Sequence, residues 1–224
     1  HTVLQEDTSN VEVRRVEAHL YDRLGDVQAT TGNLGAAEAS KHRATNIYRE
    51  LANGPTIDLA EKHNRVAQSH TVSQREYAVA LIKLGDLLGN PNFQNRGQTA
   101  AALVQYREAE DILERLYEAD SSATETMRLY GLIYERIGTI HDEEDRDAAA
   151  FDAYRRSLVL RKQFVEANPA NTDAVRDWAA RHDVSIEDVY YQEFVTLILR
   201  VPERECHALA SFCRACGIDH PLDV

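Results

Sequence analysis

The residues best suited to chemistry lie close to the end of the sequence. All three cysteines of the chain follow residue 205, and two of them form a Cys-x-x-Cys motif. Thiolates and imidazoles are the usual protein ligands of zinc, and four such groups complete a tetrahedral site. The candidate ligands are Cys206, Cys213, Cys216 and His220. The sequence therefore allows a zinc-binding C-terminal module.

Two other interpretations of these cysteines are open. A strong zinc signal has two paired ligand motifs, whereas only Cys213-x-x-Cys216 is clear here. Cys206 and Cys213 lie seven residues apart, so they would share one helix face as small buried core residues. A redox-active pair is the third interpretation, although no thioredoxin-like strand pattern precedes the motif. Burial without a cofactor is the favoured prediction, with zinc as the alternative.

No motif of a known catalytic centre stands out in the sequence. It contains no Gly-rich phosphate loop, no Gly-x-Ser-x-Gly elbow and no HExxH motif. The acidic segment 141–147 lacks the glycine and the terminal glutamate of a calcium-binding loop, so it is predicted to be a solvated turn. No nucleophile–base pair can be argued, and the chain is not expected to be an enzyme.

Composition narrows the classes of partner and compartment. The 224 residues suit one or two domains, and the formal net charge is −12. Nucleic-acid binding needs a basic face for phosphate contacts, so a nucleic-acid partner is not expected. No apolar run approaches the roughly 18 residues of a membrane span, and no secretory signal pattern opens the sequence. The expected location is the cytoplasm, without membrane contact.

Three stretches of the chain repeat one spacing of residue types. Each starts at a glycine that follows a branched apolar residue; small residues recur 12 and 19 positions later, and a long side chain, aromatic in two of the three stretches, stands 16 positions later. These steps lead from Gly25 to Ala37, Lys41 and Ala44, from Gly138 to Ala150, Tyr154 and Ser157, and, after five extra turn residues, from Gly85 to Ala102, Tyr106 and Ala109. Apolar residues at steps of three and four accompany them, which predicts pairs of amphipathic helices.

This pattern resembles the tetratricopeptide repeat, whose signature places a glycine, small residues and an aromatic at such offsets. The glycines are 60 and 53 residues apart, not about 34, so the repeats resemble long bacterial ones associated with serine/threonine kinases and regulatory proteins. The resemblance implies an all-α fold: a right-handed superhelical solenoid of antiparallel helix pairs with a divergent C-terminal helical cap. Small residues let the paired helices approach closely.

The expected domain organisation follows from the repeats. Repeats are predicted over 11–55, 73–119 and 122–168, with a partial fourth helix over 172–182, so residues 1–182 form the repeat domain. Ser73 with Glu76, and Ser122 with Glu125, have the spacing of helix-capping boxes. The cap is predicted over 183–224. Its apolar residues could support self-association of the chain: Phe194, Leu197, Ile198 and Phe212.

The resemblance implies that the first helix of each repeat lines an inner face. Positions six and three before each glycine, and one and four after it, hold five carboxylates and no Lys or Arg. The candidate peptide-binding residues are His19, Asp22, Asp26, Ile82, Asp86, Glu135, Thr139 and Asp142. An acidic groove with an apolar floor suits a basic or amphipathic segment. The alternative is a merely solvated face in an acidic chain.

The function predicted from the sequence is that of a protein–protein interaction scaffold or regulatory module. It would bind a basic or amphipathic peptide or helix on the acidic inner face. The alternative is a zinc-binding or redox-active C-terminal module, for which the repeats serve as a docking platform.

Overall fold

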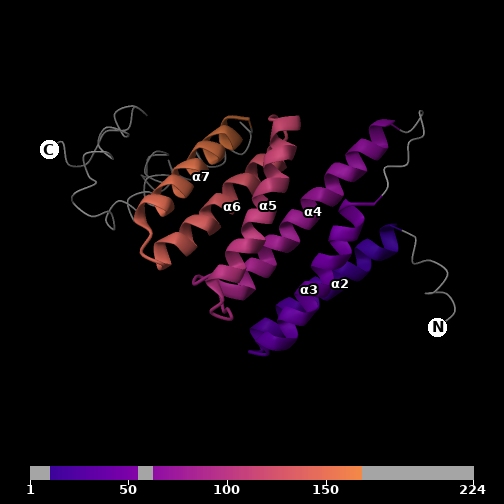
Figure 1. The fold of residues 1–224 in the computed structure, drawn as a ribbon. Helices are drawn as coiled ribbons and strands as arrows, with labels where there is room; N and C mark the ends of the chain where they lie inside the picture. The colour runs from indigo at the N-terminus through magenta and orange to yellow at the C-terminus, as the bar shows by residue number, and fades with distance from the viewer. Residues whose placement is uncertain (1–10, 55–62, 168–224) are drawn as a thin grey trace, which may run out of the picture. The chain divides into compact units, whose positions relative to one another are not determined.

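The computed structural model describes residues 11–54 and 63–167, and every regular element in these ranges is an α-helix (Figure 1). The helices are α2 (Val11–Thr30), α3 (Leu34–Ala52), α4 (His63–Gly89), α5 (Thr99–Ala119), α6 (Thr124–Glu143) and α7 (Asp147–Ala167). The predicted all-α class is thus confirmed for the described part of the chain. None of these helices is both long and apolar enough to cross a membrane.

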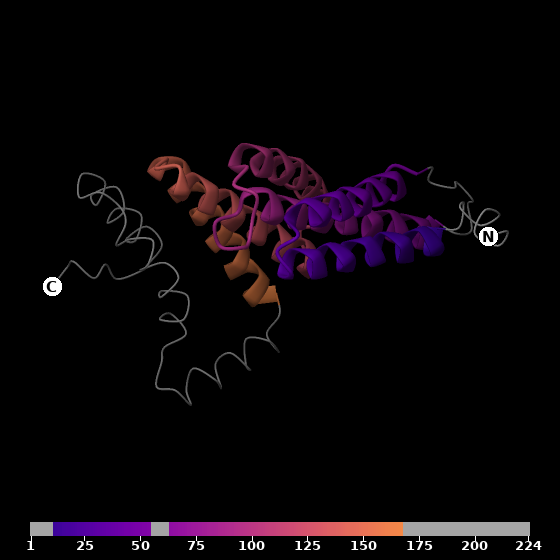
Figure 2. The same cartoon turned by 90° about the horizontal axis from the view of Figure 1, so that it is seen from below.

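The helices follow one another as three pairs. Short turns over 31–33, 90–98 and 144–146 join α2 to α3, α4 to α5 and α6 to α7. These partners share the most extensive contacts, while α3 packs on α4 and α5 packs on α6 to link one pair to the next. The pairs lie in chain order, with α2 and α3 at one end of the row and α6 and α7 at the other (Figures 1 and 2).

Each repeat glycine lies against the side chain at the middle one of the three repeat offsets. A Cβ atom on Gly25 would lie 3.0 Å from Cγ of Lys41, and one on Gly138 would lie 2.8 Å from Cε1 of Tyr154. A Cβ atom on Gly85 would overlap the ring of Tyr106. The small residues at the other two offsets are all buried: Ala37, Ala44, Ala102, Ala109, Ala150 and Ser157. The offsets seen in the sequence thus coincide with close contacts within each helix pair.

Two helix starts differ from the predicted capping boxes. Helix α4 begins at His63, and Ser73 lies buried inside it, where its hydroxyl accepts a hydrogen bond from Arg15 of α2 at 3.3 Å. A contact between helices thus takes the place of a cap. Ser122 donates its N–H and hydroxyl to Asp120 in a local turn, at 2.9 and 2.6 Å, and the capping position of α6 is Ala123. Local turn bonds of this kind compete with capping.

The end of the chain lies outside the described residues. All described helices belong to one compact unit within residues 1–168. The predicted fourth helix 172–182 and the cap 183–224 therefore stay predictions. So do the roles assigned to Cys206, Cys213, Cys216, His220, Phe194, Leu197, Ile198 and Phe212.

Candidate functional site

Two adjoining hollows lie on the surface formed by α2, α4 and α6, which we call the inner face. Their volumes are about 300 Å³ and about 420 Å³. Val79, Lys83 and Leu129 line both, so the hollows form one continuous depression across the three helices. A depression of this size is large enough for a few side chains of a bound peptide.

The structure brings five of the eight predicted groove residues to this depression. His19 and Asp22 line the smaller hollow, and Asp26, Ile82 and Asp86 line the larger one. The other three, Glu135, Thr139 and Asp142, line neither.

Asp22 is held between two lysines. Its side chain is only 7% exposed, and its two oxygens accept hydrogen bonds from Lys41 at 2.6 Å and from Lys83 at 2.5 Å. Lys41 also donates to Asp26 at 2.5 Å. Burial by itself would raise the pKa of Asp22, but the bonds from the two lysines outweigh it and lower that pKa. The carboxylate is therefore fixed in its charged form.

Asp86 has a different environment. Tyr106 donates its hydroxyl to this carboxylate at 2.7 Å, Asn90 donates its amide at 3.1 Å, and Nε of Arg136 lies 3.0 Å away in an ion pair. Burial raises the pKa of Asp86 and outweighs the opposing effect of Arg136 and of the hydrogen bonds. Burial also raises the pKa of the Tyr106 hydroxyl, so that group stays a donor.

The cations that neutralise these carboxylates were absent from the predicted site. Lys83 and Arg136 each stand two residues before a repeat glycine, and each pairs with a carboxylate on the first helix of the preceding pair. Lys41 reaches the same face from α3, a second helix. The equivalence of Lys83 and Arg136 was visible in the sequence as a matching offset, whereas the reach of Lys41 required the fold.

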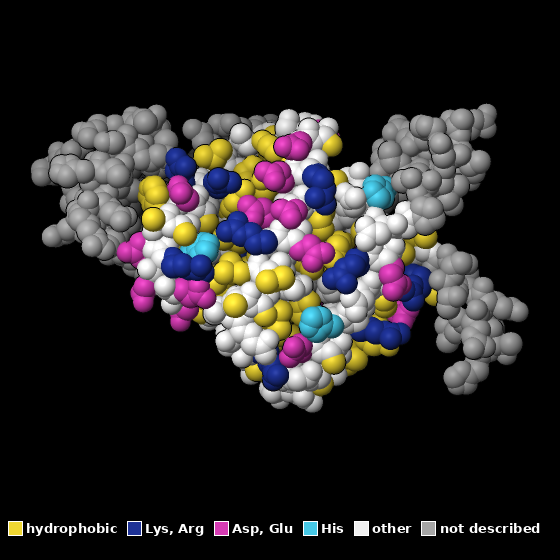
Figure 3. All heavy atoms as spheres, viewed as in Figure 1, with side chains coloured by type: hydrophobic (Ala, Val, Ile, Leu, Met, Phe, Trp, Pro, Cys, Tyr) yellow, Lys and Arg dark blue, Asp and Glu magenta, His cyan; other side chains and the backbone are white. Residues whose placement is uncertain are grey.

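The inner face consequently carries both signs of charge. The larger hollow is lined by four cations and two carboxylates: Lys41, Lys83, Arg128, Arg136, Asp26 and Asp86. Figure 3, drawn in the view of Figure 1 and not looking onto the inner face, shows Lys and Arg side chains interspersed with Asp and Glu elsewhere on the surface, with apolar side chains between them. The predicted preference for a basic peptide depended on carboxylates without nearby cations, and these contacts remove that excess of negative charge.

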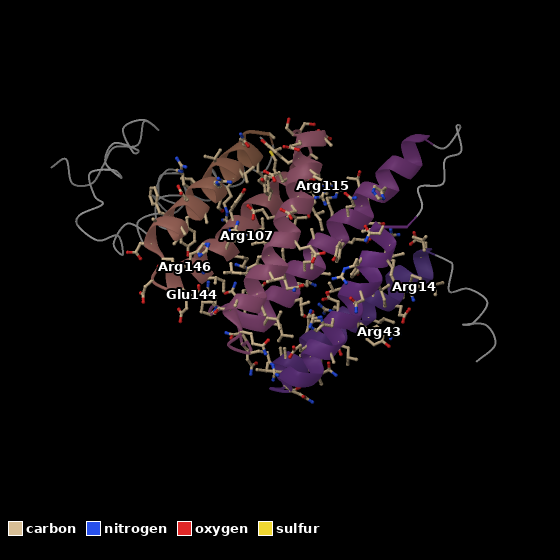
Figure 4. The ribbon with its side chains drawn as sticks, in the orientation of Figure 1. Arg14, Arg43, Arg107, Arg115, Glu144 and Arg146 are labelled. Atoms are coloured by element: carbon tan, nitrogen blue, oxygen red, sulfur yellow. The ribbon has the colours of Figure 1, made fainter. Side chains whose placement is uncertain are left out.

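The groove candidates outside the depression have structural contacts. Glu135 forms ion pairs with Arg136 and Arg161. Thr139 is buried, donates to the backbone carbonyl of Glu135 at 3.0 Å and accepts from Tyr154 at 3.4 Å. Asp142 is half-buried near the C-terminal end of α6. Beyond it, Glu144 and Arg146 lie together in the turn to α7 and form an ion pair (Figure 4).

Apolar side chains form the floor of the depression. Ile82 and Leu129 are buried beneath it, while Val79 and Leu132 are partly exposed. Phe93, in the turn after α4, is 43% exposed, and the guanidinium of Arg136 lies 4.8 Å from the centre of its ring. This arrangement offers apolar contact bordered by charges that are already paired.

Within residues 11–54 and 63–167, no three His, Cys, Asp or Glu side chains come together as a metal site. No family model matches the sequence, and comparison with curated proteins and with solved structures found no significant similarity.

Proposed function

We propose that the chain is a protein–protein interaction module that binds an amphipathic peptide or helix on the inner face. The observation that carries this proposal is the continuous depression across α2, α4 and α6, with an apolar floor bordered by paired charges. The resemblance to tetratricopeptide repeats supports it, and we propose that the three helix pairs form a right-handed superhelical solenoid of that kind.

The chemistry of the face favours an amphipathic partner over a simply basic one. One side of the partner would contact Val79, Leu132 and Phe93, and the other would meet the charges at the rim. Lys83 and Asp26 are each 40% exposed at the side chain, so the rim offers both a cation and a carboxylate. Charges of both signs determine orientation and selectivity more than net affinity.

The test is capture of amphipathic peptides of basic, neutral and acidic character at low and high salt. Val79→Glu puts a charge on the floor that both hollows share, and we expect it to weaken binding about tenfold or more. Val104→Glu is the matched control, because Val104 is 62% exposed on α5 and lines neither hollow. Absence of any captured peptide, or equal losses in both variants, would contradict the proposal.

The salt dependence identifies the class of partner. An amphipathic peptide that binds mainly through the floor should lose little affinity at high salt, because screening acts on exposed charges. Strong capture of basic peptides alone, abolished by salt, would instead restore the preference predicted from the sequence.

A further inference from the structure

Helix α2 carries an apolar stripe on its outer surface, separate from the inner face. The stripe consists of Val13, Val16, Leu20, Leu24 and Val27, whose exposed fractions run from 37% to 63%. Steps of three and four residues place these side chains on one side of the helix. A contiguous exposed stripe of large apolar side chains is uncommon on a monomeric protein and marks a contact surface.

The equivalent positions of the other first helices are covered. Counted from the repeat glycines, the stripe corresponds to Ser73, Glu76, Ala80, Leu84 and Leu87 in α4, and to Thr126, Leu129, Ile133, Ile137 and Ile140 in α6. The five in α6 are at most 2% exposed, and all but Glu76 of those in α4 are at most 4% exposed. Both helices have a preceding pair packed against them, whereas α2 lies at the end of the described row (Figure 2).

The stripe therefore continues an interface that the chain already uses twice. The same positions are buried in α4 and α6, on which α3 and α5 pack, apart from the partly exposed Glu76. Three of the five are more apolar in α2 than in α4: Val13 against Ser73, Val16 against Glu76 and Leu20 against Ala80. A helix pair placed against α2 would bury them in the same way.

The spacing of the stripe matches a second copy of itself. The steps from Val13 to Val27 are three, four, four and three residues, which is symmetric about Leu20. If two α2 helices pack antiparallel, Leu20 meets Leu20, Val16 meets Leu24, and Val13 meets Val27 of the other copy. A two-fold interface requires such self-complementarity, because the same surface serves both partners.

Charge does not oppose this contact locally. The chain has a net charge of −12, so two copies repel over most of their surfaces. Beside the stripe, however, the most exposed charged side chains are one acid and one base, Glu12 at 74% and Arg23 at 68%. The border of the stripe is thus close to neutral.

We propose that the α2 stripe is a homodimer interface, in which α2 of a second copy packs antiparallel across a two-fold axis at Leu20. The dimer joins the first helix pairs of two chains and leaves the depression on the inner face of each chain available. The proposal does not depend on the proposed peptide-binding function.

The test is the mass of the full chain in solution, measured by sedimentation over a range of concentrations. We expect a concentration-dependent shift toward twice the 25.3 kDa of one chain. Leu20→Glu should raise the dissociation constant about tenfold or more, because it places two carboxylates at the axis. Val104→Glu should leave the dissociation constant unchanged, since Val104 lies on α5 with a similar exposed fraction of 62%. Helical circular dichroism checks that each variant folds.

The register has its own test. In a chain with Cys206, Cys213 and Cys216 replaced by Ser, Leu20→Cys should form a disulfide-linked dimer on mild oxidation, because the two-fold axis brings residue 20 of both copies together. Val104→Cys should not. A chain that stays monomeric up to about 100 μM, or a dimer that Leu20→Glu leaves intact, would overturn the interface. A dimer in which Leu20→Cys fails to cross-link would overturn the antiparallel register.

Discussion

The first and second helix pairs use one position of the repeat in chemically different ways. In the first pair, Gly25 lies under the stem of Lys41, whose ammonium group pairs with Asp22 and Asp26. In the second pair, Gly85 lies under the ring of Tyr106, whose hydroxyl donates to Asp86.

The comparison shows what this position requires. In both pairs a long side chain covers the glycine and ends in a donor directed at the carboxylate one residue after it, Asp26 or Asp86. The third pair follows the same arrangement with Tyr154 and Thr139 at 3.4 Å. The covering side chains of the three pairs share their length and the direction of their donor group, but only Lys41 carries a charge. At this position the first pair therefore uses a cation, whereas the second uses a ring with a neutral hydroxyl donor, and the ion pair of Asp86 comes from Arg136 on α6.

The largest expected effect comes from removing the central cation of the first pair. Lys41→Met keeps the side-chain stem over Gly25 but leaves Asp22 buried with Lys83 as its remaining cation. We expect the free energy of unfolding to fall by about 3 kcal/mol, as when one partner of a buried ion pair is removed. Urea denaturation followed by circular dichroism measures it.

Lys83→Met provides the comparison for that result. The side chain of Lys83 is 40% exposed, whereas that of Lys41 is 5% exposed. Removal of the Lys83 charge should therefore lower the free energy of unfolding by about 1 kcal/mol or less. Equal losses in the two variants would show that Lys41 is not the centre of the cluster.

The second effect separates the two glycines. Gly85→Ala forces a methyl group into the ring of Tyr106 and should lower stability by about 2 kcal/mol. In Gly25→Ala the added methyl group contacts only the flexible stem of Lys41. The higher helix propensity of Ala, worth about 1 kcal/mol, offsets this crowding, so we expect a smaller loss of stability than for Gly85→Ala. The midpoints of urea denaturation of both variants test this. A Gly25→Ala loss as large as that of Gly85→Ala would contradict the distinction.

A smaller effect concerns the hydroxyl groups. Tyr106→Phe keeps the ring over Gly85 but removes the donor to Asp86 and the acceptor of Asn90, which should cost about 1 kcal/mol. Tyr154→Phe should cost less, because the bond to Thr139 is long at 3.4 Å. Thermal unfolding of the two variants measures the difference, and the reverse order would be inconsistent with these contacts.

The smallest effect is a difference in pH dependence between Asp22 and Asp86. The pKa of Asp22 lies below the reference value of 3.8, so its stabilising contribution is present above that pH and is lost as the pH falls through the folded-state pKa. The pKa of Asp86 is raised above 3.8, so the folded state gains stability relative to the unfolded one as the pH falls through that raised value.

Asn variants report these two contributions. On acidification, the stability advantage of the wild type over Asp22→Asn should shrink, whereas its advantage over Asp86→Asn should grow. Urea denaturation at a series of pH values gives both slopes, and slopes of the same sign would contradict the assigned environments.

The sequence predicted the helix pairs well because their determinants are local. Glycine, small and long residues recur at fixed offsets, and in the structure Gly138 lies against Tyr154 at the 16-residue offset. The predicted starts of α4 and α6 were wrong. Ser73 makes a tertiary contact with Arg15, and Ser122 makes a turn bond with Asp120, so neither residue caps a helix.

The site was less predictable because it depends on contacts between residues that are far apart in the sequence. Helical periodicity placed Asp22, Asp26 and Asp86 on one face, but it gave no information on the length and direction of side chains that arrive from other helices. Lys41 and Lys83 reach Asp22 across 19 and 61 residues of sequence. Each first helix taken alone presents mainly carboxylates on this face. After the helices pack, these carboxylates are paired with cations from neighbouring helices.

The most direct test of the shared glycine register is a double-mutant cycle between Gly85→Ala and Tyr106→Leu, measured by urea denaturation. Direct packing of the ring on the glycine predicts that the smaller Leu relieves the crowding caused by Ala. The losses of the two single variants should then exceed that of the double variant by about 1 kcal/mol or more. Losses that add to within about 0.3 kcal/mol would contradict the contact and, with it, the common register of the helix pairs.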